Sequence, residues 1–298
     1  VNKKPFKLGE NVATSKGAVV YRDEIMELVQ YAPTTDKVYE VPQGARTGRG
    51  KPIVNMFPLE EGEKVNAILS IKEFVEDRFI FMCTAQGTVK KTPLSDFSNP
   101  RKAGIIAVAL DEGDYLIGAE ITNGSQDIVL VSDAGKAVWF DEEDVRPMGR
   151  TARGVRGMRL GKGQQVLSLL VAENHQETVL VATENGYGKR TVLADFRHSG
   201  RGNQGVIAIA ASERNGKVVA ARLVKDEDEI MLITTGGVLI RTRVSEIREL
   251  GRATQGVTLI SLDDGEKLAG LEKVVESEDD SEVATGAEPE AIPGTEQQ

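Results

Sequence analysis

The side chains with the clearest chemical pattern in this sequence are lysines and arginines that recur about every 50 residues. In a repeat array, equivalent positions lie at the same height and radius, so a recurring cation becomes a stripe along the perimeter. One set lies where successive repeats meet: Arg46, Arg49, Lys51, Arg101, Lys102, Arg150, Arg153, Arg156, Arg197, Arg201 and Arg252. A second set follows the glycine of each predicted hairpin: Lys90, Lys91, Lys189, Arg190, Arg241 and Arg243.

A repeated cationic stripe suits a polyanion with regularly spaced charges. Lysine and arginine bind the phosphates of duplex DNA without reading its bases. The chain has one Trp and five Tyr, which disfavours modules that stack single-stranded bases. The alternative is that the cations keep a β-surface soluble and the array is a platform for protein interactions. Only DNA binding predicts a steep loss of affinity with salt.

The sequence does not support a catalytic centre, a metal site or a cofactor site in this chain. Gly200–Gly205 reads G-x-G-x-x-G, but a strand rather than a helix is predicted after it, as in a turn between repeats. His175 and His198 lie in loop-like segments without ligand spacing and are interpreted as exposed structural histidines. Cys83 lies in an apolar run and is expected to be a buried, inert thiol.

Short β-strands must position the basic residues. Glycines at 104, 154, 205 and 256 each open a predicted apolar strand, and the longer apolar runs between them are bounded by turns. Four strands per repeat is the density of a propeller blade, so the sequence predicts an all-β fold. The full repeats are 53–97, 104–145, 154–196 and 205–247. The half repeat 256–275 is expected to need a partner hairpin from the N-terminal side.

The two ends of the chain depart from the repeat. Residues 1–37 do not fit its spacing, and Asp23–Gln30 has helical periodicity. Residues 276–298 carry much of the net charge of −9 and are predicted to be a disordered acidic tail, which leaves 38–275 as the repeat domain. No apolar run is long enough to span a membrane, so a cytoplasmic protein with no membrane partner is expected.

Several long motifs resemble the C-terminal domain of bacterial DNA gyrase A over residues 38–275. They are 48–55, 151–157, 185–191, 241–247 and 251–257. The resemblance implies a β-pinwheel of about five to six four-stranded blades whose basic rim bends duplex DNA irrespective of sequence. It also implies a nucleoid-associated chain that has no cofactor of its own. Its partners would be the N-terminal region of gyrase A and the gyrase B protein, in a holoenzyme that uses ATP and Mg²⁺ to introduce negative supercoils.

Two departures from this family bear on function. The basic heptapeptide Q-R-R-G-G-K-G, which the family needs for wrapping, is missing. In its place, Phe6–Ala13 and Tyr31–Lys37 resemble part of a polyhydroxyalkanoate synthase, which suggests a chimeric junction near Val38–Glu40. No lipase-like box or catalytic cysteine accompanies that segment, so polyester synthesis is not implied. The related domain of topoisomerase IV lacks the heptapeptide as well, but the runs at 185–191 and 241–257 favour gyrase.

Overall fold

The computed structural model describes residues 26–32, 37–41, 55, 64–101 and 104–274, and these form an all-β fold. The longer strands are β1 (Met26–Ala32), β2 (Lys37–Val41), β3 (Lys64–Ile71), β4 (Phe79–Thr84), β5 (Thr88–Pro93), β7 (Leu116–Thr122), β8 (Asp127–Ser132), β9 (Lys136–Asp141), β11 (Val166–Ala172), β12 (Thr178–Thr183), β13 (Tyr187–Val192), β15 (Val218–Val224), β16 (Glu229–Thr234), β17 (Leu239–Arg243) and β19 (Leu268–Val274). Two-residue strands are β6 (Ile105–Ile106), β10 (Val155–Arg156), β14 (Val206–Ile207) and β18 (Val257–Thr258). Single 3-10 turns are η2 (Leu94–Phe97), η3 (Glu142–Asp144), η4 (Leu193–Asp195) and η5 (Val244–Glu246).

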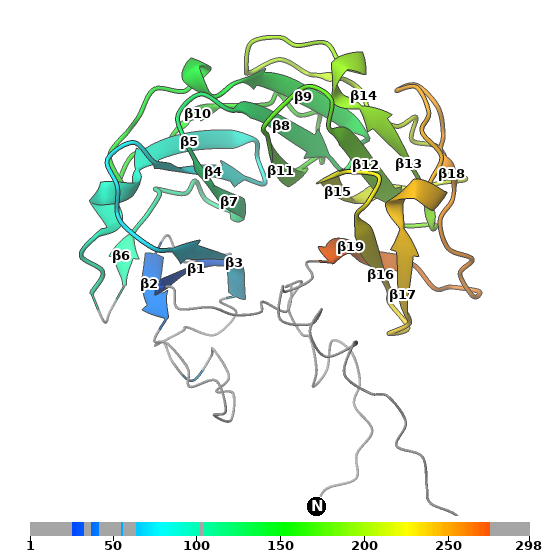
Figure 1. The fold of residues 1–298 in the computed structure, drawn as a ribbon, viewed down its shortest axis with the longest axis horizontal. Coiled ribbons are helices and arrows are strands. Elements are labelled where there is room, and N and C mark those ends of the chain that lie inside the picture. The colour runs from blue at the N-terminus through cyan, green and yellow to red at the C-terminus, as the bar shows by residue number, and fades with distance from the viewer. Residues whose placement is uncertain (1–25, 33–36, 42–54, 56–63, 102–103, 275–298) are drawn as a thin grey trace, which may run out of the picture.

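Five antiparallel sheets are arranged in an arc, with β3, β7, β11, β15 and β19 innermost (Figure 1). In the second sheet, the hairpin β4–β5 is joined on its inner side by β7 and on its outer side by β10. In the chain, β10 lies between β9 and β11, which are both strands of the third sheet, but it pairs with β5 of the second sheet. The same exchange places β6, β14 and β18. This exchange is that of a β-pinwheel, and the predicted fold class is confirmed.

Strands β4, β8 and β12 are apolar on both faces because their sheets are covered by neighbouring sheets. All six residues of β12 are buried, and so are five of the six in β4 and in β8. Strands enclosed in this way read as continuous Val, Leu and Ile runs rather than as alternating ones. Between the third and fourth sheets, Val129 and Val131 of β8 belong to the same core cluster as Val179 and Val181 of β12.

The repeat glycines are required where the chain reaches the preceding sheet. Gly154 has φ of +109°, and a Cβ built on it would lie 2.4 Å from the carbonyl oxygen of Val89 in β5. A side chain at this position would therefore both strain the backbone and collide with it. Gly205 makes the equivalent approach to Ala137 of β9, at 2.3 Å. The steps of 50 and 51 residues thus record one strand-exchange contact per repeat.

The helical interpretation of Asp23–Gln30 is wrong, because Met26–Ala32 forms strand β1. This strand lies between β2 and β3 and pairs with both, with a bulge between Gln30 and Tyr31. The hydrogen bonds that β1 makes along both of its edges stabilise the strand more than the weak helical periodicity of this segment would stabilise a helix. Met26–Ala32, part of the atypical segment 1–37, therefore lies inside the first sheet.

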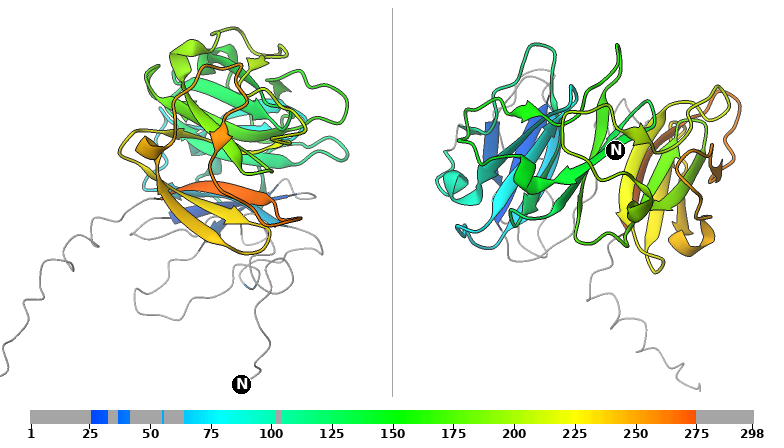
Figure 2. Two further views of the ribbon diagram at one scale, coloured as in Figure 1. Left: turned by 90° about the vertical axis from the view of Figure 1, so that its right-hand side faces the viewer. Right: turned by 90° about the horizontal axis from the view of Figure 1, so that it is seen from above.

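The prediction that 256–275 needs an N-terminal hairpin is also wrong. Strand β18 completes the fourth sheet beside β13, and β19 pairs with β16 in the fifth. Among the described residues, the incomplete edge belongs to β17, since the fifth sheet has the order β17-β16-β19. Leu239 in this strand is 60% exposed, whereas the equivalent Val89 in β5 is fully buried. Figure 2 shows the first and fifth sheets at opposite ends of the arc.

Candidate nucleic-acid interface

The structure divides the predicted DNA-binding residues by exposure. Exposed members are Arg101, Arg153, Arg156, Arg197, Arg201, Arg241 and Arg243. Partly buried members are Arg150 and Arg252. Buried members are Lys90, Lys91, Lys189 and Arg190. Arg46, Arg49, Lys51 and Lys102 lie outside the described residues. The predicted stripe therefore contains two kinds of cation with different environments.

The expectation that Lys90 and Lys189 lie on an exposed stripe is wrong, since each is 1% exposed. Lys90 Nζ donates hydrogen bonds to the carbonyl oxygens of Ala107, at 2.5 Å, and Arg150. Lys189 Nζ donates equivalently to Gly251 at 2.6 Å and Arg252 at 2.5 Å. Burial lowers the pKa of both lysines to about 8, and a neighbouring arginine adds to the shift. Each lysine thus connects a hairpin strand to a junction segment, the stretch of chain between two successive repeats.

Lys91 and Arg190, expected on the same exposed stripe, are buried as well, and each lies beside an acid. Lys91 Nζ lies 3.7 Å from a carboxylate oxygen of Glu142, which is itself fully buried, and donates to the Glu142 carbonyl at 3.2 Å. Arg190 Nε donates to the carbonyl of Ile247 at 2.7 Å, and its guanidinium pairs with Asp226. Charges this deeply buried require such partners. These backbone acceptors lie in or directly after the turns η3 and η5, and no sequence pattern reveals these contacts.

A junction segment follows each of the turns η3, η4 and η5 and runs along the second hairpin strand of the preceding sheet. The backbone N–H of Met148 donates to the carbonyl of Lys91 in β5, that of Ser199 to Trp139 in β9, and that of Leu250 to Arg190 in β13. Two cations flank each contact, four residues apart. The pairs are Arg146 with Arg150, Arg197 with Arg201 and Arg248 with Arg252. The junctions therefore carry a repeated pair of arginines alongside β5, β9 and β13.

Arg146 and Arg248 are absent from the predicted stripe, although the period contained the signal. Arg197 lies 51 residues after Arg146 (197 − 146 = 51) and 51 before Arg248 (248 − 197 = 51). All three side chains are exposed, and none of the three forms an ion pair within the described residues. Their charges are therefore available to an external anion.

In the first two pairs, the second arginine also binds a backbone carbonyl of the neighbouring junction. Arg150 Nη1 donates to the carbonyl of Ile106 at 3.2 Å, and Arg201 Nη1 makes the equivalent bond to Arg156 at 3.0 Å. Three other exposed arginines of the predicted stripe are already paired with acids. Arg153 pairs with Asp111, and Arg241 and Arg243 both pair with Glu229. Arg146, Arg197 and Arg248 therefore form the core of the candidate interface.

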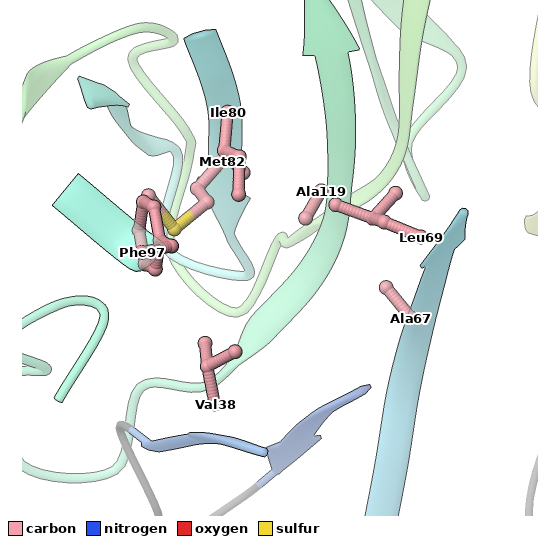
Figure 3. Close-up of a pocket in the computed structure, with 7 residues that line it drawn as sticks. All are labelled: Val38, Ala67, Leu69, Ile80, Met82, Phe97 and Ala119. Atoms are coloured by element: carbon pink, nitrogen blue, oxygen red, sulfur yellow. The ribbon is translucent and has the colours of Figure 1, made fainter. Parts of the chain in front are cut away.

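One hollow among the described residues is enclosed by the apolar core. Figure 3 shows an apolar space between the first and second sheets, lined by Val38, Ala67, Leu69, Ile80, Met82, Phe97 and Ala119. Its free volume of about 10 Å³ is that of a packing defect in the core. Cys83 is fully buried as predicted, and burial raises the pKa of its thiol. No helix in the described ranges is long and apolar enough to cross a membrane.

Comparison with protein families gives two matches. The family described as DNA gyrase C-terminal domain, beta-propeller, matches 37–72, 78–123, 126–173, 177–225 and 228–274. These five segments each contain the three longer strands of one sheet or part of them. The family described as poly-beta-hydroxybutyrate polymerase (PhaC) N-terminus matches residues 1–43. Both resemblances inferred from the sequence are therefore confirmed.

Curated relatives are longer than this chain. The DNA gyrase A protein of Klebsiella oxytoca is 52% identical over 247 residues, which cover 83% of this chain and 28% of that protein. The gyrase A proteins of Escherichia coli (49% identical, 84% and 28% covered) and Neisseria gonorrhoeae (48% identical, 86% and 33% covered) are similar. The chain thus spans about a third of their length or less.

Solved structures agree on the fold. The DNA gyrase A C-terminal domain matches with a TM-score of 0.74 and 26% identity, covering 86% of this chain and 84% of that one. The C-terminal domain of DNA topoisomerase IV matches with a TM-score of 0.78, covering 84% of this chain and 79% of that one. Its identity is 24%, so this likeness concerns the fold alone.

Proposed function

The chain belongs to the family of DNA gyrase C-terminal domains, and we propose that it binds duplex DNA across its arginine-bearing junctions without reading sequence. The observation that carries this proposal is the set of exposed arginines repeated at 51-residue steps, Arg146, Arg197 and Arg248. Guanidinium groups bind phosphate oxygens well, and phosphate contacts carry no base information. Arg156, Arg201 and the partly buried Arg252 add to the same junctions.

The proposal extends to a role within a larger enzyme. The chain would bend DNA for a type II topoisomerase whose remaining parts are the N-terminal region of gyrase A and the gyrase B protein. ATP and Mg²⁺ would be used by those parts, with no cofactor in this chain, and the location would be the cytoplasm at the nucleoid. Gyrase A relatives of about 50% identity favour gyrase over topoisomerase IV as the parent enzyme.

The experiment is a salt titration of binding to unrelated linear duplexes. The triple variant Arg146→Ala/Arg197→Ala/Arg248→Ala removes three phosphate contacts, so the slope of log affinity on log salt should flatten by up to roughly 0.9 per lost contact. Lys72→Ala/Lys225→Ala is the charge control, because both exposed lysines follow inner strands, β3 and β15. An unchanged slope in the triple variant, or an equal loss in the control, would contradict the proposal.

Bending is a separate demand on the same surface. A bend of 40–90° over 20–30 base pairs costs on the order of 1–6 kcal/mol, so contacts must continue along the DNA to offset it. Without the basic heptapeptide, the chain should bind linear duplex yet shift the linking number of ligated circles little. Deleting 276–298 should strengthen binding at low salt, because the acidic side chains of that segment compete for the arginines. A large topological shift by the intact chain would show that the heptapeptide is dispensable.

A further inference from the structure

We propose that the third sheet binds a divalent transition-metal ion of the Zn²⁺ class at the end where β8 begins and β9 ends. The ligands would be Asp127, Asp141 and His198. The ligand atoms of these three residues lie within 4.8 Å of one another. Asp127 begins β8, Asp141 ends β9, and His198 follows η4 in the next repeat. Sequence spacing gave no sign of the group, because the strand exchange brings the histidine to the hairpin.

The distances suit a tetrahedral ion. His198 Nε2 lies 3.3 Å from Asp141 Oδ1 and 3.5 Å from Asp127 Oδ1. Two ligands bound to Zn²⁺ at its usual bond lengths are separated by about 3.3 Å. One imidazole and two carboxylates leave a fourth position for water, which is the arrangement of an open zinc site.

The electrostatics favour a cation at the same place. Asp127 and Asp141 are directly opposed in the antiparallel register of β8 and β9. Like charges opposed in this way destabilise a sheet, and an ion between them removes the repulsion. The equivalent pairs in the second, fourth and fifth sheets hold no second carboxylate: they are Phe79 with Pro93, Thr178 with Val192, and Glu229 with Arg243.

His175 is a positioning residue rather than a ligand. Its Nε2 lies 2.8 Å from Asp127 Oδ2, the oxygen that does not face His198. A bond to that second oxygen fixes the orientation of the carboxylate, and such outer partners typically contribute 10–100-fold to metal affinity. Both histidines of the chain are thus assigned to one site.

Trp139 provides a direct optical report on this site. It is the only tryptophan of the chain, and its ring centroid lies 4.9 Å from that of His175 and 4.7 Å from that of His198. Its buried indole N–H has no hydrogen-bond acceptor among the described residues, so a donor remains available beside the cluster.

The test is a titration of the full chain with Co²⁺ and with Zn²⁺ at pH 7.5, followed by tryptophan fluorescence and by the visible absorption of Co²⁺. We expect saturable quenching by Co²⁺ that EDTA reverses and Zn²⁺ displaces. His198→Ala and Asp141→Asn should each weaken binding by at least 10-fold. His175→Asn should weaken it less and leave the Co²⁺ spectrum that of the same ligand set. Asp264→Asn, at an exposed turn, is the control and should bind as the parent does.

Three outcomes would overturn the site. The first is the absence of saturation at millimolar metal, and the second is equal affinity in His198→Ala and the parent chain. The third is a loss in Asp264→Asn as large as that in Asp141→Asn. Circular dichroism of each variant shows whether it is folded. If His198→Ala does not fold, Asp141→Asn decides the question, because the Asp141 side chain is 61% exposed and its amide preserves shape.

Discussion

The second and fourth sheets differ from the third and fifth at two adjacent positions of the second hairpin strand, which is β5, β9, β13 or β17. Aligned by hairpin register, the first position holds Lys90, Val138, Lys189 and Ile240 in sheet order. The next position holds Lys91, Trp139, Arg190 and Arg241. The second and fourth sheets bury both cations against backbone carbonyls. The third buries Val138 and Trp139, and in the fifth Ile240 and Arg241 are exposed.

This difference shows that one repeat position can be buried in one sheet and exposed in another, and that recurrence of a basic residue does not by itself place it on the surface. Lys90 and Arg146 both belong to a basic pattern of about 50 residues, yet one is buried against backbone and the other is exposed. A buried cation satisfies carbonyls that the junction leaves unpaired, whereas an exposed one is available to phosphate. The same strand position can also become apolar, and then the junction is held by other contacts, as at Trp139.

The largest effect is expected from breaking the buried ion pair of the second sheet. Lys91→Met should destabilise the fold by about 3–5 kcal/mol, because Glu142 would keep a buried charge without its cation. Urea denaturation at pH 7 measures the loss. Lys91→Met/Glu142→Gln should recover part of it, since the amide keeps hydrogen-bonding capacity and carries no charge. A single-variant loss below about 1 kcal/mol would mean that the pair is no more than a surface ion pair.

A smaller effect is expected from the buried lysine of the fourth sheet. Lys189→Met removes donors from the carbonyls of Gly251 and Arg252 and should cost about 1–3 kcal/mol. At temperatures where the variant is folded, its DNA salt slope should equal that of the parent, in contrast to the variant at Arg146, Arg197 and Arg248. A flattened slope in Lys189→Met would restore this lysine to the DNA interface.

Much of this fold could be predicted, because strand exchange leaves a period in the sequence. The predicted bounds of the strands Val166–Ala172 and Val218–Val224 are the observed ones. Whether a given cation is buried or exposed could not be predicted. Both faces of these strands are covered, so an alternation of apolar and polar residues no longer distinguishes buried from exposed positions. The contacts of both His175 and His198 with Trp139 could not be predicted either, since they depend on a junction between two repeats.

The buried lysines should make stability depend on alkaline pH. The folded pKa of Lys90 and Lys189 is lowered to about 8 from an unfolded value of 10.5, so the unfolded chain binds more protons between these values. Stability contributed by these groups therefore rises as pH increases from about 8 to 10.5. Denaturation midpoints of the parent and of Lys90→Met/Lys189→Met, compared across this window, isolate the contribution. A difference between the two chains that stays constant with pH would contradict the lowered pKa values.

The smallest effect is expected in the fifth sheet, where β17 has no outer strand among the described residues. Leu239→Ala should change the free energy of unfolding by no more than about 0.5 kcal/mol, as at other exposed positions. Val89→Ala, at the equivalent and fully buried position beside β10, should cost about 1–3 kcal/mol through lost burial and a cavity. Parallel urea denaturation of the two variants measures both. If Leu239→Ala cost as much as Val89→Ala, this edge of the fifth sheet would be covered in solution, and its contrast with the second sheet would disappear.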